Sequence, residues 1–85
     1  MRKFEYTIKD ALGIHARPAG SLAKIAKDLD SEVTVFKGMK FASATKIMAL
    51  MGLGAKQGDI LTVTVEGGDE VASESVLKEF FEKNL

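Results

Sequence analysis

The chain contains no cysteine and only one histidine among its 85 residues. The absence of cysteine excludes disulfide bonds and thiolate metal sites, and a single histidine argues against a histidine-based metal cluster. We therefore expect neither a metal nor a cofactor. The chain also lacks the run of about 18 apolar residues that a membrane-spanning helix needs, and it does not start with the apolar stretch of a signal peptide. These absences predict a cytoplasmic protein that does not insert into a membrane.

Neither sign of charge is in excess, because twelve basic residues balance twelve acidic ones. The basic residues are scattered rather than gathered into a stripe, which argues against nucleic-acid binding. The length predicts a single domain over residues 1–85, and we expect a monomer. A domain of this size buries only about 60 to 65 % of the surface that its unfolded chain exposes, so a deep active-site pocket is not expected.

Hydrophobic spacing predicts seven secondary-structure elements in the order β-α-β-β-α-β-α. Strands are predicted over residues 3–9, 33–36, 40–42 and 60–66, and helices from about Pro18, over residues 46–53, and from Asp69. Ser43 or Thr45 is predicted to cap the second helix, and Gly54 suits the left-handed residue that ends it. Ala72, Val76, Leu77 and Phe80 are predicted to share one side of the last helix. A hairpin among strands otherwise separated by helices predicts an α+β fold, with a four-stranded antiparallel sheet covered on one face by three helices.

His15 lies just ahead of the first predicted helix, in the sequence Gly-Ile-His-Ala-Arg-Pro-Ala. A neutral imidazole is a competent nucleophile near pH 7, and unpaired N–H groups at a helix start can bind phosphoryl oxygens. Arg17 supplies a planar permanent charge that suits those oxygens, while Gly13 is expected to leave space for a partner to approach. A lone histidine at a helix start is usually a cap or a solvated residue, and the residues alone leave both interpretations open.

The sequence resembles the histidine-containing phosphocarrier family, called HPr, of the bacterial sugar phosphotransferase system. The resemblance covers the whole chain and is most specific over residues 13–19, with a second motif over residues 47–54 that is followed by Lys-Gln-Gly-Asp. It implies an open-faced βαββαβα sandwich. It also implies that His15 takes a phosphoryl group through its Nδ1 atom from phosphorylated enzyme I, with phosphoenolpyruvate as the ultimate donor. The group then passes to a histidine on the A domain of a sugar-specific permease, and Arg17 matches the family's phosphoryl-stabilising arginine.

The second motif, Ile-Met-Ala-Leu-Met-Gly-Leu, is apolar almost all round although it spans barely two helical turns. Leu50 and Leu53 are predicted to enter the core, whereas Ile47, Met48 and Met51 are predicted to form an exposed patch. In the resembled family this helix and the first helix, here residues 16–22, dock both donor and acceptor. The resemblance therefore implies a partner-binding surface whose members are Ala16, Gly20, Ile47, Met48 and Met51.

Three positions depart from the family pattern. Lys46 stands where many relatives carry a regulatory serine, and lysine cannot accept that phosphate. Leu12 replaces a small polar residue near the helix start, so capping there must come from elsewhere. Gly20 replaces a commoner alanine and is expected to loosen the first helix slightly.

Two other functions remain open from the sequence. A paralogue of the same fold could use His15 in a nitrogen-related or dihydroxyacetone-linked phosphorelay. A regulatory module could bind partners through Met48 and Met51 without carrying phosphate, although His15 and Arg17 together count against it. Independent enzymatic turnover is the weakest candidate, because no second acid, base or nucleophile stands near His15 in the sequence.

Overall fold

The computed structural model describes all 85 residues, and its elements follow the predicted order. The strands are β1 (Arg2–Thr7), β2 (Glu32–Lys37), β3 (Lys40–Ser43) and β4 (Ile60–Glu66), and the helices are α1 (Ala16–Asp28), α2 (Ile47–Gly52) and α3 (Glu70–Asn84). None of these helices is both long and apolar enough to cross a membrane.

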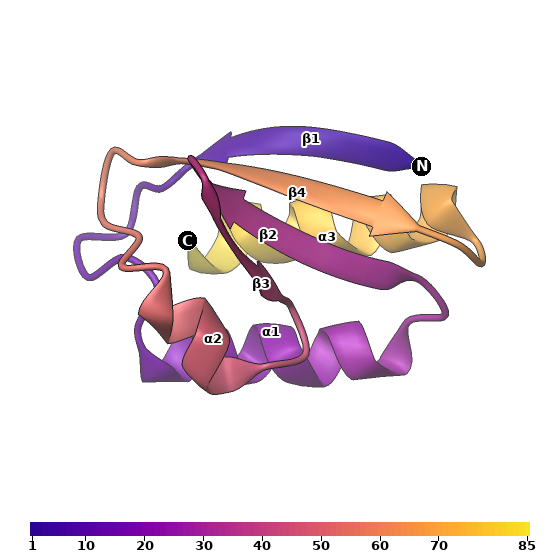
Figure 1. Ribbon diagram of the computed structural model, residues 1–85, viewed down its shortest axis with the longest axis horizontal. Helices are drawn as coiled ribbons and strands as arrows, with labels where there is room; N and C mark the ends of the chain where they lie inside the picture. Colours follow the sequence, from indigo (N-terminus) through magenta and orange to yellow (C-terminus); the bar gives the residue numbers. More distant parts are fainter.

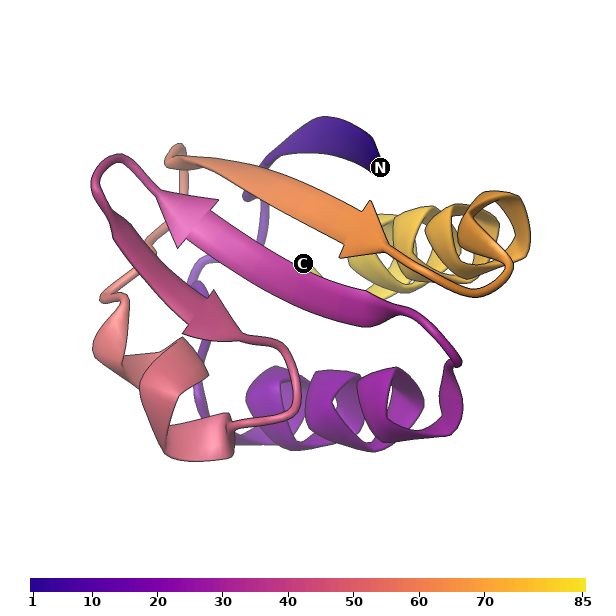
Figure 2. The same cartoon turned by 45° about the vertical axis from the view of Figure 1, so that its right-hand side comes forward.

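The four strands form one antiparallel sheet in the order β1-β4-β2-β3. All three helices lie on the same side of it, and α2 lies beside the first half of α1 (Figures 1 and 2). The hairpin predicted around Gly38 joins β2 to β3, with Lys37 opposite Lys40. The predicted fold class is confirmed.

The inward faces of the two central strands form the middle of the core. Val33 and Val35 of β2 and Leu61, Val63 and Val65 of β4 are all at most 3 % exposed. In β4 the buried residues alternate with Thr62 and Thr64 in the sequence, because every second side chain of a strand points the same way. In β1, an edge strand, Phe4 and Tyr6 are only half-buried. Ile8 lies beyond the end of β1 and is fully buried.

The predicted side of α3 is wrong in two of its four residues. Leu77 and Phe80 are buried, but Ala72 and Val76 face solvent, Val76 with 43 % exposure. Phe81 is fully buried instead, with its ring 5.5 Å from that of Tyr6 and 5.8 Å from that of Phe4. Burial of this larger ring turns the helix away from the side that the smaller residues marked, since burying a phenyl group stabilises the fold more than burying a methyl group.

The same rotation buries two polar side chains of α3, and both have partners. Glu74 accepts a hydrogen bond from Nε of Arg2 at 2.7 Å. The hydroxyl of Ser73 lies 2.8 Å from that of Ser31, which also donates to the carbonyl of Gly67 at 2.6 Å. These bonds offset the cost of burial, because a buried polar group without a partner destabilises a fold.

The start of α3 is fixed by Asp69, whose side chain accepts a hydrogen bond from the backbone N–H of Ala72 at 3.2 Å. Loss of such a cap costs about 1 kcal/mol. We therefore expect Asp69→Ala to lower the melting temperature by roughly 4 to 8 °C, as such a loss does in a domain of this size. Calorimetry checks this. Asp69→Asn keeps an acceptor oxygen and should melt close to the wild type, whereas equal loss in both variants contradicts the assignment of the cap.

The predicted cap of α2 is wrong. Lys46 is the N-cap residue and makes no side-chain cap bond, while the hydroxyls of Ser43 and Thr45 lie 3.0 Å from each other. The two hydroxyls satisfy one another before the helix begins, as short polar side chains often do in turns. Gly54 directly follows Leu53, the C-cap residue of α2, and with φ of +65° it is the predicted left-handed residue.

Candidate functional site

The loop that carries His15 is anchored by two buried isoleucines. Ile8 is 1 % exposed and Ile14 is 6 % exposed. The N–H of Ile14 donates to the carbonyl of Ala55 at 3.1 Å, and the N–H of Gly13 donates to the carbonyl of Asp10 at 3.0 Å. Hydrogen bonds to the carbonyls of Asp10 and Ala55 thus hold the loop in place just before His15.

Gly13 has a different role from the one predicted. It has φ of +65° and is buried, and a Cβ there would lie 2.1 Å from the carbonyl oxygen of Ala55 and 2.9 Å from Cα of Lys56. The space beside Gly13 is therefore filled by the chain itself and is not open to a partner. Glycine is required because the residue 55–56 backbone approaches the loop so closely.

The segment against which Gly13 packs is itself braced. Ile8 donates to the carbonyl of Asp59 at 2.9 Å, and Gly58 donates to the carbonyl of Ile8 at 2.8 Å. The Asp59 carboxylate accepts the backbone N–H of Lys56 at 2.8 Å, and this bond, with a further contribution from Lys37, holds the pKa of Asp59 below its usual value. A folded turn, rather than a loose loop, therefore backs the His15 segment.

His15 is the N-cap residue of α1, with φ of −109° and ψ of −175°, and its side chain makes no cap bond. The imidazole is half-buried, so it lies at the surface without being extended into solvent. Its carbonyl accepts the N–H of Ala19 at 3.0 Å. His15 therefore occupies the N-cap position, but its side chain does not cap the helix, and neither ring nitrogen is engaged in that role.

Two backbone donors remain unpaired at the start of α1. The N–H groups of Ala16 and Arg17 have no acceptor within the helix, because the first turn of a helix never has one. Pro18 has no N–H, and the N–H of Ala19 is already bonded to His15. These free donors and the positive end of the helix favour an anion beside the imidazole.

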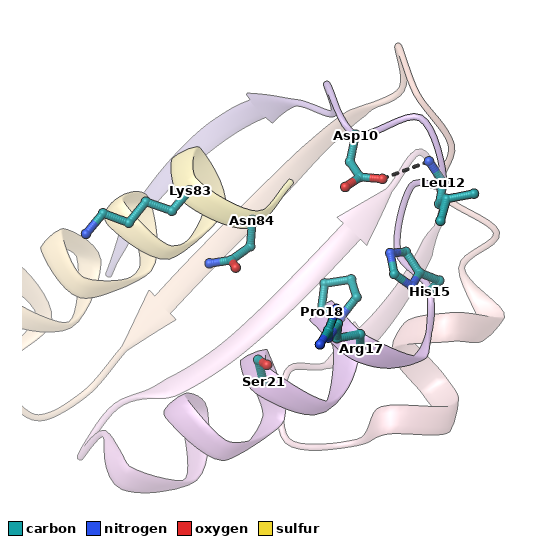
Figure 3. Close-up of a pocket in the computed structure, with 8 residues that line it drawn as sticks. All are labelled: Asp10, Leu12, His15, Arg17, Pro18, Ser21, Lys83 and Asn84. Atoms are coloured by element: carbon teal, nitrogen blue, oxygen red, sulfur yellow. Dashed lines mark hydrogen bonds between the residues drawn. The ribbon is translucent and has the colours of Figure 1, made fainter.

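His15 lies on the wall of an open depression of about 460 Å³ (Figure 3). Its lining comes from the loop before α1, the first turns of α1 and the end of α3: Asp10, Leu12, His15, Arg17, Pro18, Ser21, Lys83 and Asn84. The lining is mostly polar, with apolar surface from Leu12 and Pro18, and the depression is too open to enclose a substrate. Such a hollow suits a group that must be received from one macromolecule and given to another.

The charged groups around the depression differ in whether they are neutralised. Lys83 pairs with Glu79 at 2.7 Å, which offsets its charge. Arg17 is exposed and has no carboxylate partner. A planar guanidinium free of any ion pair can bind two phosphoryl oxygens side by side. No group of three or more His, Asp or Glu side chains is placed to hold a metal ion.

Four residues at the rim were missed by the sequence reasoning, namely Asp10, Ser21, Lys83 and Asn84. Lys83 and Asn84 come from the far end of the chain, and no local pattern links them to His15. Asp10 had a local signal, because an aspartate two residues before Leu12 can accept its backbone N–H, and this bond is present at 2.8 Å. This bond lies within the turn before His15 and does not cap α1, whose N-cap residue makes no side-chain bond.

The predicted division of α2 into core and surface is confirmed. Leu50 and Leu53 are at most 2 % exposed, while Met48 is 78 % exposed, Ile47 41 % and Met51 36 %. α2 packs against α1 near the end that carries His15 (Figure 2). The apolar patch of Ile47, Met48 and Met51 therefore lies on the helix that neighbours the start of α1.

The two α1 residues assigned to partner binding are also accessible. Ala16 is exposed, and a Cβ at Gly20 would meet open space. Lys46, just ahead of the patch, is exposed, and it occupies the N-cap position of α2. All five predicted docking residues, Ala16, Gly20, Ile47, Met48 and Met51, can thus be reached from solvent to some degree.

The model of the family described as "PTS HPr component phosphorylation site" matches residues 2–83. The chain belongs to the HPr family. The HPr proteins are phosphocarriers of the phosphotransferase system, and the chain is a phosphocarrier by its membership of this family.

Curated and solved HPr proteins resemble the chain along most of its length. Phosphocarrier protein HPr of Mycoplasma genitalium is 39 % identical over 85 residues, which is 99 % of this chain and 97 % of the relative. HPr of Haemophilus influenzae is 47 % identical over 58 residues, 68 % of each chain. A crystal structure of HPr from Thermoanaerobacter tengcongensis has a TM-score of 0.90 at 34 % identity and covers 98 % of this chain and 93 % of its own.

Proposed function

We propose that His15 is the residue on which this phosphocarrier receives and delivers its phosphoryl group. The observation that supports the proposal most strongly is the uncapped start of α1. His15 and the unpaired guanidinium of Arg17 line one shallow depression, and the free N–H groups of Ala16 and Arg17 directly follow His15 at the start of α1. A helix cap would need the His15 side chain to bond inward, and it makes no such bond.

The transfer step follows from these groups. The lone pair of Nδ1 attacks phosphorus, the N–P bond to His15 forms, and the bond from phosphorus to the donor atom breaks. The oxygens of the transferred group remain anionic throughout, so Arg17 and the two free N–H groups lower the free energy of the bound phosphoryl group. Delivery repeats this step with the acceptor nitrogen as the attacking atom, so a new N–P bond forms to the acceptor while the bond between phosphorus and Nδ1 of His15 breaks.

We assign the donor to enzyme I and the acceptor to the A domain of sugar-specific permeases, as the family pattern implies. An open depression supports this, because each partner must present its reactive atom to His15 directly. The exposed patch on α2 gives both partners an apolar surface, and methionine side chains can adapt to more than one shape. Both proteins must also leave quickly, which suits a small interface.

A two-stage transfer assay tests the function. The protein is mixed with phosphoenolpyruvate and a catalytic amount of enzyme I, and intact mass is measured under alkaline conditions. We expect one acid-labile phosphoryl adduct, which then disappears when a permease A domain is added in excess. If enzyme I is phosphorylated by phosphoenolpyruvate but no adduct forms on this protein, the proposal is contradicted. An adduct that no A domain removes contradicts the assigned acceptor.

Met48→Asp tests the docking surface. Met48 is 78 % exposed, so the change should alter the free energy of unfolding by less than about 0.5 kcal/mol. A charge at the centre of an apolar interface should weaken the binding free energy by on the order of 1 to 2 kcal/mol. The KM of enzyme I for this protein should therefore rise about tenfold. Steady-state transfer kinetics measure the effect.

Val71→Asp is the matched control for this change. Val71 is also a large apolar side chain, 63 % exposed, but it lies at the start of α3, away from α2 (Figure 1). Its replacement should leave KM unchanged. If Met48→Asp mainly lowers the melting temperature, or if both variants raise KM equally, the patch is not the docking surface.

A further inference from the structure

Two charges near His15 lack an ion-pair partner, and they have opposite signs. Arg17, on α1, is the cation, and Asp10, on the loop that carries His15, is the anion (Figure 3). The only other charged side chain of the lining, Lys83, is paired with Glu79 at 2.7 Å. Arg17 and Asp10 are therefore the two unpaired side-chain charges in the depression that His15 lines.

Three hydrogen bonds fix the position of Asp10. Its N–H donates to the main-chain oxygen of Leu85 at 2.8 Å, and its carbonyl accepts the N–H of Gly13 at 3.0 Å. One carboxylate oxygen accepts the N–H of Leu12 at 2.8 Å. The side chain cannot swing away from the depression without loss of the last bond, so its negative charge stays on the wall that His15 shares.

We propose that Asp10 sets the donor strength of the phosphorylated protein by repelling the phosphoryl group on His15. The inference rests on the proposed role of His15. A carboxylate held near phosphoryl oxygens raises the free energy of the phosphorylated form. The repulsion is relieved as the N–P bond breaks, since the departing group carries less charge in a loose transition state. Arg17 attracts the phosphoryl group and Asp10 repels it. The repulsion favours transfer of the group to an acceptor over its retention on His15.

The lifetime of the adduct measures this repulsion without any partner protein. Phosphoramidate transfers its phosphoryl group to the imidazole and releases ammonia, so enzyme I is not needed. In the hydrolysis that follows, a water oxygen bonds to phosphorus while the N–P bond breaks. The imidazole gains one proton and inorganic phosphate is released. Loss of the adduct from His15 is followed by phosphorus NMR and intact mass.

Two variants separate the charge of Asp10 from its place in the turn. Asp10→Asn removes the charge, keeps the oxygen that accepts the N–H of Leu12 and adds an amide NH2 group. Asp10→Ala removes the whole carboxylate and adds no hydrogen-bond donor. We expect both variants to hold the phosphoryl group roughly threefold to tenfold longer than the wild type, the range for one unit charge across a solvated gap. The difference should shrink in 1 M salt, which screens charge but not a structural effect.

Asp28→Asn is the control, because this carboxylate lies at the other end of α1 and lines no part of the depression. It should leave the lifetime unchanged. An unchanged lifetime in both Asp10 variants, a longer one in Asp10→Asn alone, or a difference that salt does not reduce overturns the role of Asp10 and leaves the proposed function intact. A wild type that forms no adduct at residue 15 overturns both.

Discussion

His15→Ala should abolish phosphoryl acceptance completely, with no residual adduct after prolonged incubation with phosphoenolpyruvate and enzyme I. His15 is the only histidine of the chain, and the chain has no cysteine, so no other imidazole or thiolate can take its place. The side chain is half-buried and makes no cap bond, so its removal should change the free energy of unfolding by no more than about 0.5 kcal/mol.

The measurement pairs adduct formation with stability. Intact mass under alkaline conditions reports the adduct, and urea denaturation reports the fold. A folded His15→Ala variant that still forms an acid-labile adduct contradicts the assignment of the nucleophile. Loss of the adduct together with loss of the fold contradicts the claim that the imidazole is structurally uninvolved.

Gly13→Ala should be among the most destabilising single changes in the chain, at about 3 kcal/mol or more. Two effects add. The left-handed backbone at Gly13 penalises any side chain, and the new Cβ would lie 2.1 Å from the carbonyl oxygen of Ala55. Relief of that contact requires movement of the 55–56 backbone, which also carries the carbonyl that binds Ile14.

Gly54→Ala separates the two effects. Gly54 has the same φ of +65°, but nothing lies within 4 Å of the position of its Cβ. This variant should lose only the left-handed penalty, about 1 to 2 kcal/mol. Urea denaturation of the two variants measures the difference. Equal losses in both contradict the close approach at Gly13.

The sequence predicted most of the strands because they carry a local signal. Leu61, Val63 and Val65 alternate with threonines, and this period determines which face is buried. The start of α1 was also predictable, because Pro18 fits the first turn of a helix. These features depend on neighbours within a few residues, which a single sequence displays directly.

Two of the errors arose where contacts between residues far apart in the sequence decide the structure. Gly13 was read as space for a partner, but it is filled by Ala55, which is 42 positions further along the chain. The buried side of α3 depends on Phe81 packing against Phe4 and Tyr6 of β1. No pattern among the neighbouring residues in the sequence indicates such contacts.

The residues of the candidate site also fall into those that a local sequence motif predicts and those that only the folded structure brings together. His15 and Arg17 were predicted from a contiguous motif, and the exposed patch on α2 from an apolar helix too short to be wholly buried. The opposite wall of the depression was not predicted, because Lys83 and Asn84 reach it only through the packing of α3. Asp10 was missed because its polar turn with Leu12 accounts for it without reference to His15.

The central claim is that the phosphoryl group is carried on Nδ1 of His15, and direct location of the group on the wild-type protein tests it most sharply. The protein is phosphorylated with phosphoenolpyruvate and enzyme I, and the imidazole is then observed by phosphorus-coupled nitrogen NMR at alkaline pH. The expected result is a single phosphorus coupling at Nδ1 of His15 and no other phosphorylated residue. Coupling at Nε2, or a stable phosphate on a serine or threonine with His15 unmodified, contradicts it.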